Sequence, residues 1–314
     1  MRRNSVLLLL SLLAGTLLSG CLHAGQSVET SGGGVSDVPG ESSEEGTSGA
    51  RGVPEATAGA ATEIEGDLAG ADEASAGVPF VSKTRAGGGS GYDADTVLAM
   101  RHGAYGDYER AVIDFGTGWE TAGTVPEWTL VSPEADGLVR VSLPSTTATR
   151  VSDGGFSGGL LEGFYIVQAP EGGLFVDFFA RDAFLYRVLE LEDPARLVVD
   201  FEPVGGAPKV SPPARSGNTV LVEPRQHAGI SDPLMVSGYS RHREAANTIT
   251  LIDSHGKVLA RRTVRSNGWN HTWGYFEATL DLPPFSGEGT LKVGTGGAHK
   301  SDLEGIEVPV SASR

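Results

Sequence analysis

The sequence contains little cysteine and comparatively few basic residues. Cys21 is the only cysteine among 314 residues, so no disulfide can form within the chain, and each folded unit must rely on its apolar core. Lysine and arginine total 24 against 40 acidic residues, a formal charge of −16, which argues against nucleic acid as a partner because phosphates attract basic clusters. Beyond the N-terminal segment no run of 18 apolar residues occurs, so no membrane-spanning helix is predicted there.

The N-terminal segment has the pattern of a secretory signal. Arg2 and Arg3 precede a short apolar run that ends in small residues, and this run is shorter than the about 20 residues that span a bilayer. The order Leu18-Ser19-Gly20-Cys21 resembles the bacterial lipobox. The resemblance implies that residues 1–20 are cleaved and that Cys21 carries a diacylglycerol and palmitate. The alternative is an ordinary secretory signal in which Cys21 is incidental.

The predicted location follows from this signal. A lipid on Cys21 places the mature chain outside the cytoplasm, anchored to the cell membrane, because each buried methylene contributes ~0.8 kcal/mol to membrane binding. Leu22, rather than an aspartate, follows the cysteine. By resemblance, this favours the outer membrane if the organism has two membranes.

Residues 21–90 are predicted to be a disordered acidic tether. The segment is rich in Gly, Ser, Ala and Glu and has almost no large apolar residue, so it cannot bury enough surface to offset its ordering entropy. A flexible chain of this length reaches roughly 45 Å, enough to carry folded domains away from the lipid. A helix near Ala69 is an alternative that nothing in the sequence requires.

The remainder predicts an all-β fold with two consecutive β-sandwich-type domains, residues 91–206 and 218–314, joined by a proline-rich linker at 207–217. The first domain could also close as a small barrel, and residues 183–192 could form a short helix. The period-two alternation and the turn residues predict these strands: 110–115, 128–131, 138–143, 164–169, 174–180, 185–191, 196–202, 220–223, 234–239, 248–253, 258–264, 273–280, 290–295 and 306–311.

Charge differs between the two domains. Residues 91–208 have 19 acids and 7 bases, whereas residues 209–314 have 10 acids and 12 bases. The bases of the last domain include a cluster that is either a solvated strand face, the interpretation we favour, or a patch for an anionic wall polymer: Arg241, Arg243, Arg261, Arg262 and Arg265.

Residues 96–203 resemble the AMIN-like domains of bacterial envelope proteins. The resemblance lies in an Arg-His motif with two tyrosines and in two similar strands, Arg-Ala-Val-Ile-Asp-Phe at 110–115 and Arg-Leu-Val-Val-Asp-Phe at 196–201: Arg101, His102, Tyr105, Tyr108, Arg110, Pro194, Arg196, Val198 and Asp200. In related amidases such a module holds cell-wall material. From the residues themselves, we expect Asp114 and Asp200 to pair with arginines on an outer sheet face rather than to bind a ligand.

Residues 220–310 resemble the immunoglobulin-like domain of bacterial spore germination proteins. The matching pieces begin at Val222-Glu223-Pro224, include Trp273 and Phe276, and end at Val308-Pro309-Val310, whereas the loop 296–304 departs from the family. The resemblance implies an envelope context and a non-catalytic domain.

No catalytic set is predicted. Gly155-Phe156-Ser157-Gly158-Gly159 fits the Gly-x-Ser-x-Gly pattern, but a nucleophile elbow needs a helix after the serine, and here another strand is expected. The histidines lack the i, i+4 spacing of a helical zinc pair, so neither a metal nor a cofactor is predicted.

The candidate ligand-binding residues are aromatic and basic. Trp269, Trp273 and Tyr275 alternate along one stretch and would form a glycan-stacking platform if they share an exposed face, although such residues are more often core. Arg101 and His102 are the candidates in the first domain. We therefore expect a non-enzymatic, lipid-anchored envelope protein that binds peptidoglycan or another wall polymer. The alternatives are a hydrolase using Ser157 or an accessory of a wall enzyme, and a scaffold that recruits envelope proteins through sheet edges of the last domain.

Overall fold

A computed structural model describes residues 57–58, 62–63, 70–83, 85–132, 137–205, 210–268, 270–296 and 303–313. These residues belong to one compact unit, Arg51–Arg314, and contain 23 strands and one short helix. The all-β fold class is confirmed. Cys21, the predicted signal and most of the predicted tether lie outside the described residues.

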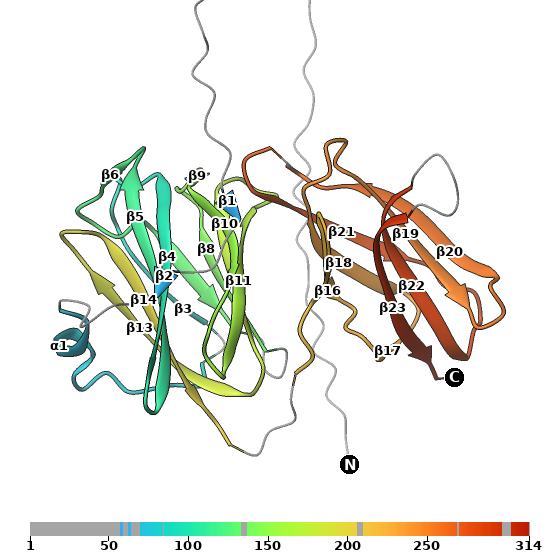
Figure 1. The fold of residues 1–314 in the computed structure, drawn as a ribbon, viewed down its shortest axis with the longest axis horizontal. Coiled ribbons are helices and arrows are strands. Elements are labelled where there is room, and N and C mark those ends of the chain that lie inside the picture. The colour runs from blue at the N-terminus through green and yellow to red at the C-terminus, as the bar shows by residue number, and fades with distance from the viewer. Residues whose placement is uncertain are drawn as a thin grey trace, which may run out of the picture. The chain divides into compact units, whose positions relative to one another are not determined.

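The first domain is built around a seven-stranded sheet (Figure 1). Its strands run in the order β13 (Phe184–Leu191), β14 (Arg196–Pro203), β5 (Tyr108–Thr117), β4 (Thr96–Tyr105) and β2 (Thr62–Glu63). The two-residue strands β6 (Glu120–Thr121) and β9 (Ala148–Thr149) pair with β5 and β4. One face of this sheet packs on the main hydrophobic core, in which Ile113, Phe115, Leu197 and Phe201 are fully buried.

The second sheet has eleven strands and continues from one domain into the next. Its path is β15 (Ala214–Ser216), β16 (Thr219–Glu223), β18 (Leu234–Ser240), β21 (Trp273–Leu280), β11 (Leu161–Gln168), β12 (Leu174–Ala180), β8 (Leu138–Leu143), β7 (Trp128–Val131) and β3 (Arg85–Gly88). The strands β10 (Val151–Gly155) and β1 (Thr57–Ala58) lie off this path, β10 on β11 and β1 on β10. The domains join where β11 and β21 pair in parallel.

A five-stranded sheet completes the second domain. Its order is β17 (Ala228–Ile230), β23 (Leu303–Ala312), β22 (Gly287–Gly296), β19 (Ala246–Asp253) and β20 (Val258–Arg265). Its inner face packs against β18 and β21 around a core that includes Ile249, Phe276, Leu291 and Val308. Each of the seven strands predicted for this domain is confirmed, and the short strands β15 and β17 were not predicted.

Strand β12 explains how the two domains share apolar contacts. All seven of its residues are buried, because Leu174, Val176 and Phe178 face the main core while Phe175 and Phe179 face a second cluster. That cluster also holds residues of the second domain, namely Val220, Val222, Tyr239 and Trp273. Apart from Asp177 the strand is apolar throughout, which is typical of a strand buried on both faces.

Two predicted boundaries need correction. Helix α1 (Ala71–Ser75) and β3 lie within the predicted tether, and Ala71 is fully buried, so ordered structure begins well before residue 91. Strand β15 lies within the predicted linker and pairs with β16. Both segments are poor in apolar residues, so the sequence did not indicate that they are ordered. Each adds only one or two small side chains to a sheet surface that longer strands build. Residues 184–191 form a strand, as predicted, rather than the alternative helix.

Candidate functional site

A polar cluster lies on the outer face of the seven-stranded sheet, where β5 and β14 pair. These strands carry the two similar hexapeptides and run antiparallel, so Arg110 lies opposite Asp200, and Arg196 lies opposite Asp114. Residues directly opposite on one face of a sheet have Cβ atoms about 5 Å apart, within reach for an ion pair. The sequence similarity therefore places an arginine opposite an aspartate twice along these two strands.

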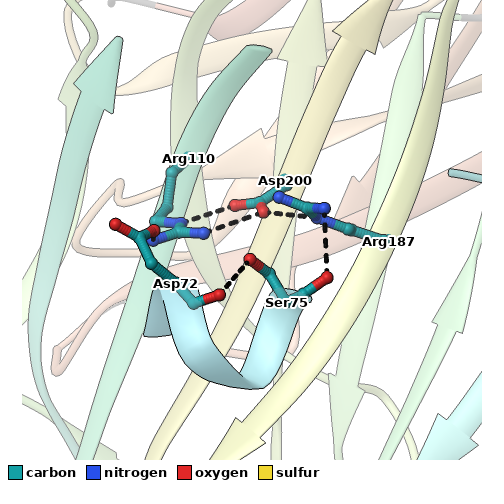
Figure 2. A network of polar contacts seen from close by, with 5 residues as sticks. All are labelled: Asp72, Ser75, Arg110, Arg187 and Asp200. Atoms are coloured by element: carbon teal, nitrogen blue, oxygen red, sulfur yellow. Dashed lines mark hydrogen bonds and ion pairs between the residues drawn. The ribbon is translucent and has the colours of Figure 1, made fainter. Parts of the chain in front are cut away.

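The first pair is part of a covered triad, Arg110, Asp200 and Arg187. Arg110 donates from Nε to Asp200 Oδ1 at 2.7 Å and from Nη2 to Oδ2 at 3.0 Å, and Arg187 donates from Nε to Oδ2 at 2.7 Å (Figure 2). The Arg110 and Asp200 side chains are fully buried, and that of Arg187 is 12% exposed. One carboxylate serves two guanidinium groups, so the covered triad carries one positive charge in excess.

The second pair belongs to an open triad, Arg101, Asp114 and Arg196. Arg101 on β4 donates from Nε and Nη2 to the two oxygens of Asp114, at 2.7 and 2.6 Å. Arg196 lies opposite Asp114 on the neighbouring strand β14, and its Nε donates to the carbonyl of Pro194. Burial and the nearby charge of Arg101 lower the pKa of Arg196, while Asp114 opposes the change. The open triad also has two arginines for one aspartate.

Aromatic rings flank the covered triad. The guanidinium carbon of Arg110 lies 5.1 Å from the ring centre of Tyr105 and 5.4 Å from that of Tyr108, and these two rings stack on each other at the end of the β4–β5 hairpin. Arg187 lies 5.0 Å from Tyr108 and 4.5 Å from Phe80. Burial opposes the charge of Arg110, but the hydrogen bonds and charge of Asp200 outweigh it and raise the pKa of this guanidinium. Arg110 thus stays charged at any physiological pH.

Helix α1 covers this triad, as Figure 2 shows. Asp72 Oδ1 accepts a hydrogen bond from Arg110 Nη1 at 3.0 Å, and the Ser75 carbonyl accepts one from Arg187 Nη1 at 3.5 Å. Ala71 packs into an apolar patch beside the triad, formed by residues of β5, β13 and β14: Val112, Leu189, Leu191 and Val198. The chain itself therefore supplies the carboxylate that neutralises the covered triad.

A pocket of about 500 Å³ adjoins the same place. Its lining includes Val78 and Pro79 from the segment after α1, Lys83, and Arg187 of the triad. Glu190, also in the wall, is occupied by hydrogen bonds from the Trp128 indole and the Gly89 amide, both at 2.8 Å. The volume lies within the range of small-ligand pockets.

The structure separates the two candidates of the first domain. Arg101 belongs to the open triad on the outer face. His102, the next residue on β4, points to the opposite face, where its Nε2 lies 3.1 Å from Glu109 Oε2 and its ring stacks on Phe156. His102 is 2% exposed, so it contributes to the interior and not to a surface shared with Arg101.

Trp273 and Tyr275, two members of the candidate aromatic platform, do not share an exposed face. Trp273 is fully buried between the domains, where its Nε1 donates to Asp153 Oδ1 at 2.9 Å and its ring meets Tyr165 edge-on. Tyr275 is half-buried and donates its hydroxyl to Glu277. Trp269 lies outside the described residues. Trp273, with the partly buried Tyr275 packed against the same cluster, thus belongs to the interdomain core.

The loop around Ser157 connects two strands, β10 and β11, so the helix that a nucleophile elbow requires is replaced by a strand. The loop closes on Glu109, whose carboxylate accepts hydrogen bonds from the Leu160 and Leu161 amides at 2.6 and 3.0 Å. A Cβ on Gly158 would lie 2.1 Å from Glu109 Oε2, so close approach to this carboxylate explains the glycine there. The Gly-x-Ser-x-Gly segment thus belongs to a loop that is fixed to the Glu109 carboxylate through the Leu160 and Leu161 amides, an arrangement that we call the latch.

The part of the chain that the structure describes holds neither a candidate metal site nor a membrane-spanning helix. Among those residues, no group of three or more His, Cys, Asp or Glu side chains is placed to hold a metal ion. The same residues include no helix that is long and apolar enough to cross a membrane.

The residues at the covered triad were only partly anticipated. The similarity of the two hexapeptides was evident from the sequence, and arginine partners for both aspartates were expected. Arg187 was missed, and burial of Asp200 was not foreseen, because the segment that covers it was assigned to the tether. Pairing the hexapeptides antiparallel would have placed each arginine opposite an aspartate.

The fold is a pair of β-sandwich domains, and the second has the strand count of an immunoglobulin-like domain. Residues 219–299 match the family model described as the immunoglobulin-like domain of bacterial spore germination, which confirms the resemblance predicted for that segment. The matched domain is a non-catalytic fold. The AMIN-like resemblance of residues 96–203 stays a prediction. No curated protein and no solved structure matches the chain.

Proposed function

We propose that the protein is a lipid-anchored, non-enzymatic component of the cell envelope that binds anionic cell-wall material, peptidoglycan first, on the outer face of its first sheet. The observation that carries this proposal is the open triad, in which two arginines, Arg101 and Arg196, flank the single carboxylate of Asp114, beside the covered triad, whose own excess charge Asp72 neutralises. Such an excess stands out in a chain with a formal charge of −16. Guanidinium groups bind carboxylates and phosphates through paired hydrogen bonds, and aromatic rings beside them add contact area.

Peptidoglycan binding is tested by co-sedimentation. The full chain with Cys21→Ser, which removes the lipid, is mixed with purified peptidoglycan at low and high salt. We expect pelleting at low salt that weakens as salt rises, because the exposed charges are screened within about 10 Å at 0.1 M. Absence of pelleting at low salt would contradict the proposal.

The anchor is tested separately. Full-length chain made in a bacterial host is expected to sediment with membranes and to carry a diacylglycerol on Cys21, detected as a mass increase of the N-terminal peptide. Cys21→Ser is expected to remain in the soluble extract. In a host with two membranes we expect the lipidated form in the outer one.

A second candidate function is recruitment of envelope proteins through a sheet edge. Strand β20 ends the five-stranded sheet, and Arg261, Arg262 and Arg265 along it are exposed. Edge strands often carry charged residues that prevent pairing with other chains, which is why we rank this function second. A pull-down that captures an envelope protein without any wall polymer would favour it.

A further inference from the structure

We infer that residues 70–80, which we call the strap, close a binding site for a carboxylate-bearing peptide, and that the ligand displaces the strap from the covered triad. The inference deepens the proposed function, because it rests on a binding role for this sheet face and names the ligand chemistry and its regulation. Figure 2 shows the arrangement on which it depends.

The strap already occupies the site as a peptide ligand would. Asp72 places a carboxylate oxygen 3.0 Å from Arg110 Nη1, and the Ser75 carbonyl accepts a hydrogen bond from Arg187. A side-chain carboxylate and a backbone carbonyl three residues later are both features of peptides. The fully buried Asp200 fixes both guanidinium groups, so the two donors are held in position whether or not the strap is docked.

The strap is held by few interactions. Its helix has five residues and no side-chain hydrogen bond at its N-cap, Gly70, and an isolated helix of this length is not stable in water. The Asp72 side chain is 55% exposed, which makes its ion pair a weak one. Segments with so few buried contacts open at a small fraction of the global unfolding free energy.

The end of the strap defines a hinge. Val81 and Tyr186 exchange two backbone hydrogen bonds, at 2.8 and 3.0 Å, and thereby hold the chain on the sheet directly after the strap. Phe80, at the boundary between the two parts, lies under the guanidinium of Arg187, and its ring is tilted against that of Tyr108. When residues 70–80 lift, the exposed surface comprises the arginines, the tyrosine rings and the enlarged pocket that Val78 and Pro79 now line.

The test measures binding of fluorescent peptides to the full Cys21→Ser chain and to further variants of it. One probe is a synthetic peptide with the sequence of residues 70–80, and the other is the soluble stem-peptide fraction released from purified peptidoglycan, so the two arms separate a protein segment from wall peptide as the source of the carboxylate. Asp72→Asn removes the competing carboxylate. Ala71→Gln places a larger side chain where Ala71 packs without free space and forces the strap off the sheet.

We expect Asp72→Asn to bind at least one probe about threefold to fivefold more tightly than the parent, the change that loss of one partly exposed ion pair would produce. Ala71→Gln is expected to bind at least tenfold more tightly. Arg187→Gln added to either variant is expected to reverse the gain. Glu73→Gln is the matched control: it changes the same charge on the same exposed helix, yet Glu73 contacts neither arginine, so no gain is expected.

Three results would overturn the inference: no gain in either strap variant with either probe, an equal gain in Glu73→Gln, or a gain that Arg187→Gln leaves intact. Its failure is distinct from failure of the proposed function. If the parent pellets with peptidoglycan but the strap variants bind no better, the strap inference is wrong and the proposed function stands. If the strap variants bind the peptide of residues 70–80 but no form of the chain pellets, the strap inference stands and the proposed function is wrong.

Discussion

Arg110 and Asp200 form a bidentate, fully buried ion pair between two neighbouring antiparallel strands, at 2.7 and 3.0 Å. Their counterparts Arg196 and Asp114 stand at the other end of the same two strands, but there Asp114 pairs with Arg101 in a more open setting. The same six-residue pattern thus yields one buried and one partly exposed charge cluster. What distinguishes them is helix α1, which covers only the first.

This difference predicts unequal costs for the same substitution. Asp200→Asn leaves two buried guanidinium groups without their carboxylate, and removal of one partner from a buried pair costs about 3–5 kcal/mol of unfolding free energy. Asp114→Asn in the open triad is expected to cost about 0–1 kcal/mol. Urea unfolding of the full chain measures both. Equal costs would show that the covered triad is not desolvated as described.

Trp273 offers a second test, of the interdomain core. Trp273→Phe removes the hydrogen bond to the buried Asp153 carboxylate and is expected to lower the unfolding free energy by about 2–3 kcal/mol, typical of a lost hydrogen bond to a charged group. Trp119→Phe is the control, since Trp119 is 72% exposed and its replacement is expected to change stability by less than about 0.5 kcal/mol. A near-neutral Trp273→Phe would argue for a surface role of that residue.

Gly158 tests the latch around Glu109. Gly158→Ala would place a methyl group 2.1 Å from Oε2 of Glu109, whose carboxylate is held by His102 and by the amides of Leu160 and Leu161, so a loss of about 1–3 kcal/mol is expected from overpacking. Gly155→Ala serves as the matched control in the same segment, because its Cβ would meet nothing closer than 3.9 Å. Thermal unfolding of the two variants is the measurement, and equal midpoints would contradict the latch.

Glu109 predicts a pH dependence of stability. Burial tends to raise the pKa of this carboxyl group, but hydrogen bonds from His102 and from the amides of Leu160 and Leu161 outweigh burial and lower the pKa below its usual 4.5. A carboxyl group with a lowered pKa in the folded state stabilises the fold above the unfolded pKa, and this contribution disappears as the pH falls through the folded pKa.

The variant that isolates this contribution is Glu109→Gln. Its unfolding free energy is expected to be lower than that of the parent at pH 7 by about 1–3 kcal/mol, with the difference shrinking below pH 4.5. Urea unfolding at several pH values measures the difference. If the gap instead stays constant or widens in acid, the carboxylate is not the group that the latch depends on.

The sequence could predict most strands because their evidence is local. Alternating burial along β8, with Val139, Val141 and Leu143 inside, follows directly from period-two apolar residues. The missing parts depend on long-range contacts. Helix α1 has a single fully buried alanine, so nothing in its own composition indicates that it docks onto a sheet formed by residues 96–203.

The candidate site was predictable to a similar extent. Arg110 and Asp200 were marked by the repeated hexapeptide, whereas Arg187 gave no signal because its partner is reached only through strand pairing. Trp273 did give a signal in the sequence, but that signal was ambiguous. Alternating aromatic residues look the same whether they face solvent or a second domain, and only the pairing of β21 with β11 decides the matter.

The most direct measurement of the central claim is the affinity of the full Cys21→Ser chain for purified peptidoglycan when one arginine at a time is replaced. Arg187→Gln removes a guanidinium of the covered triad, and Arg261→Gln removes an exposed one from β20 of the second domain. We expect Arg187→Gln to weaken binding about tenfold or more, since a desolvated charged pair contributes more than 1.4 kcal/mol, and Arg261→Gln to bind like the parent. Unchanged binding by Arg187→Gln together with loss in Arg261→Gln would contradict it.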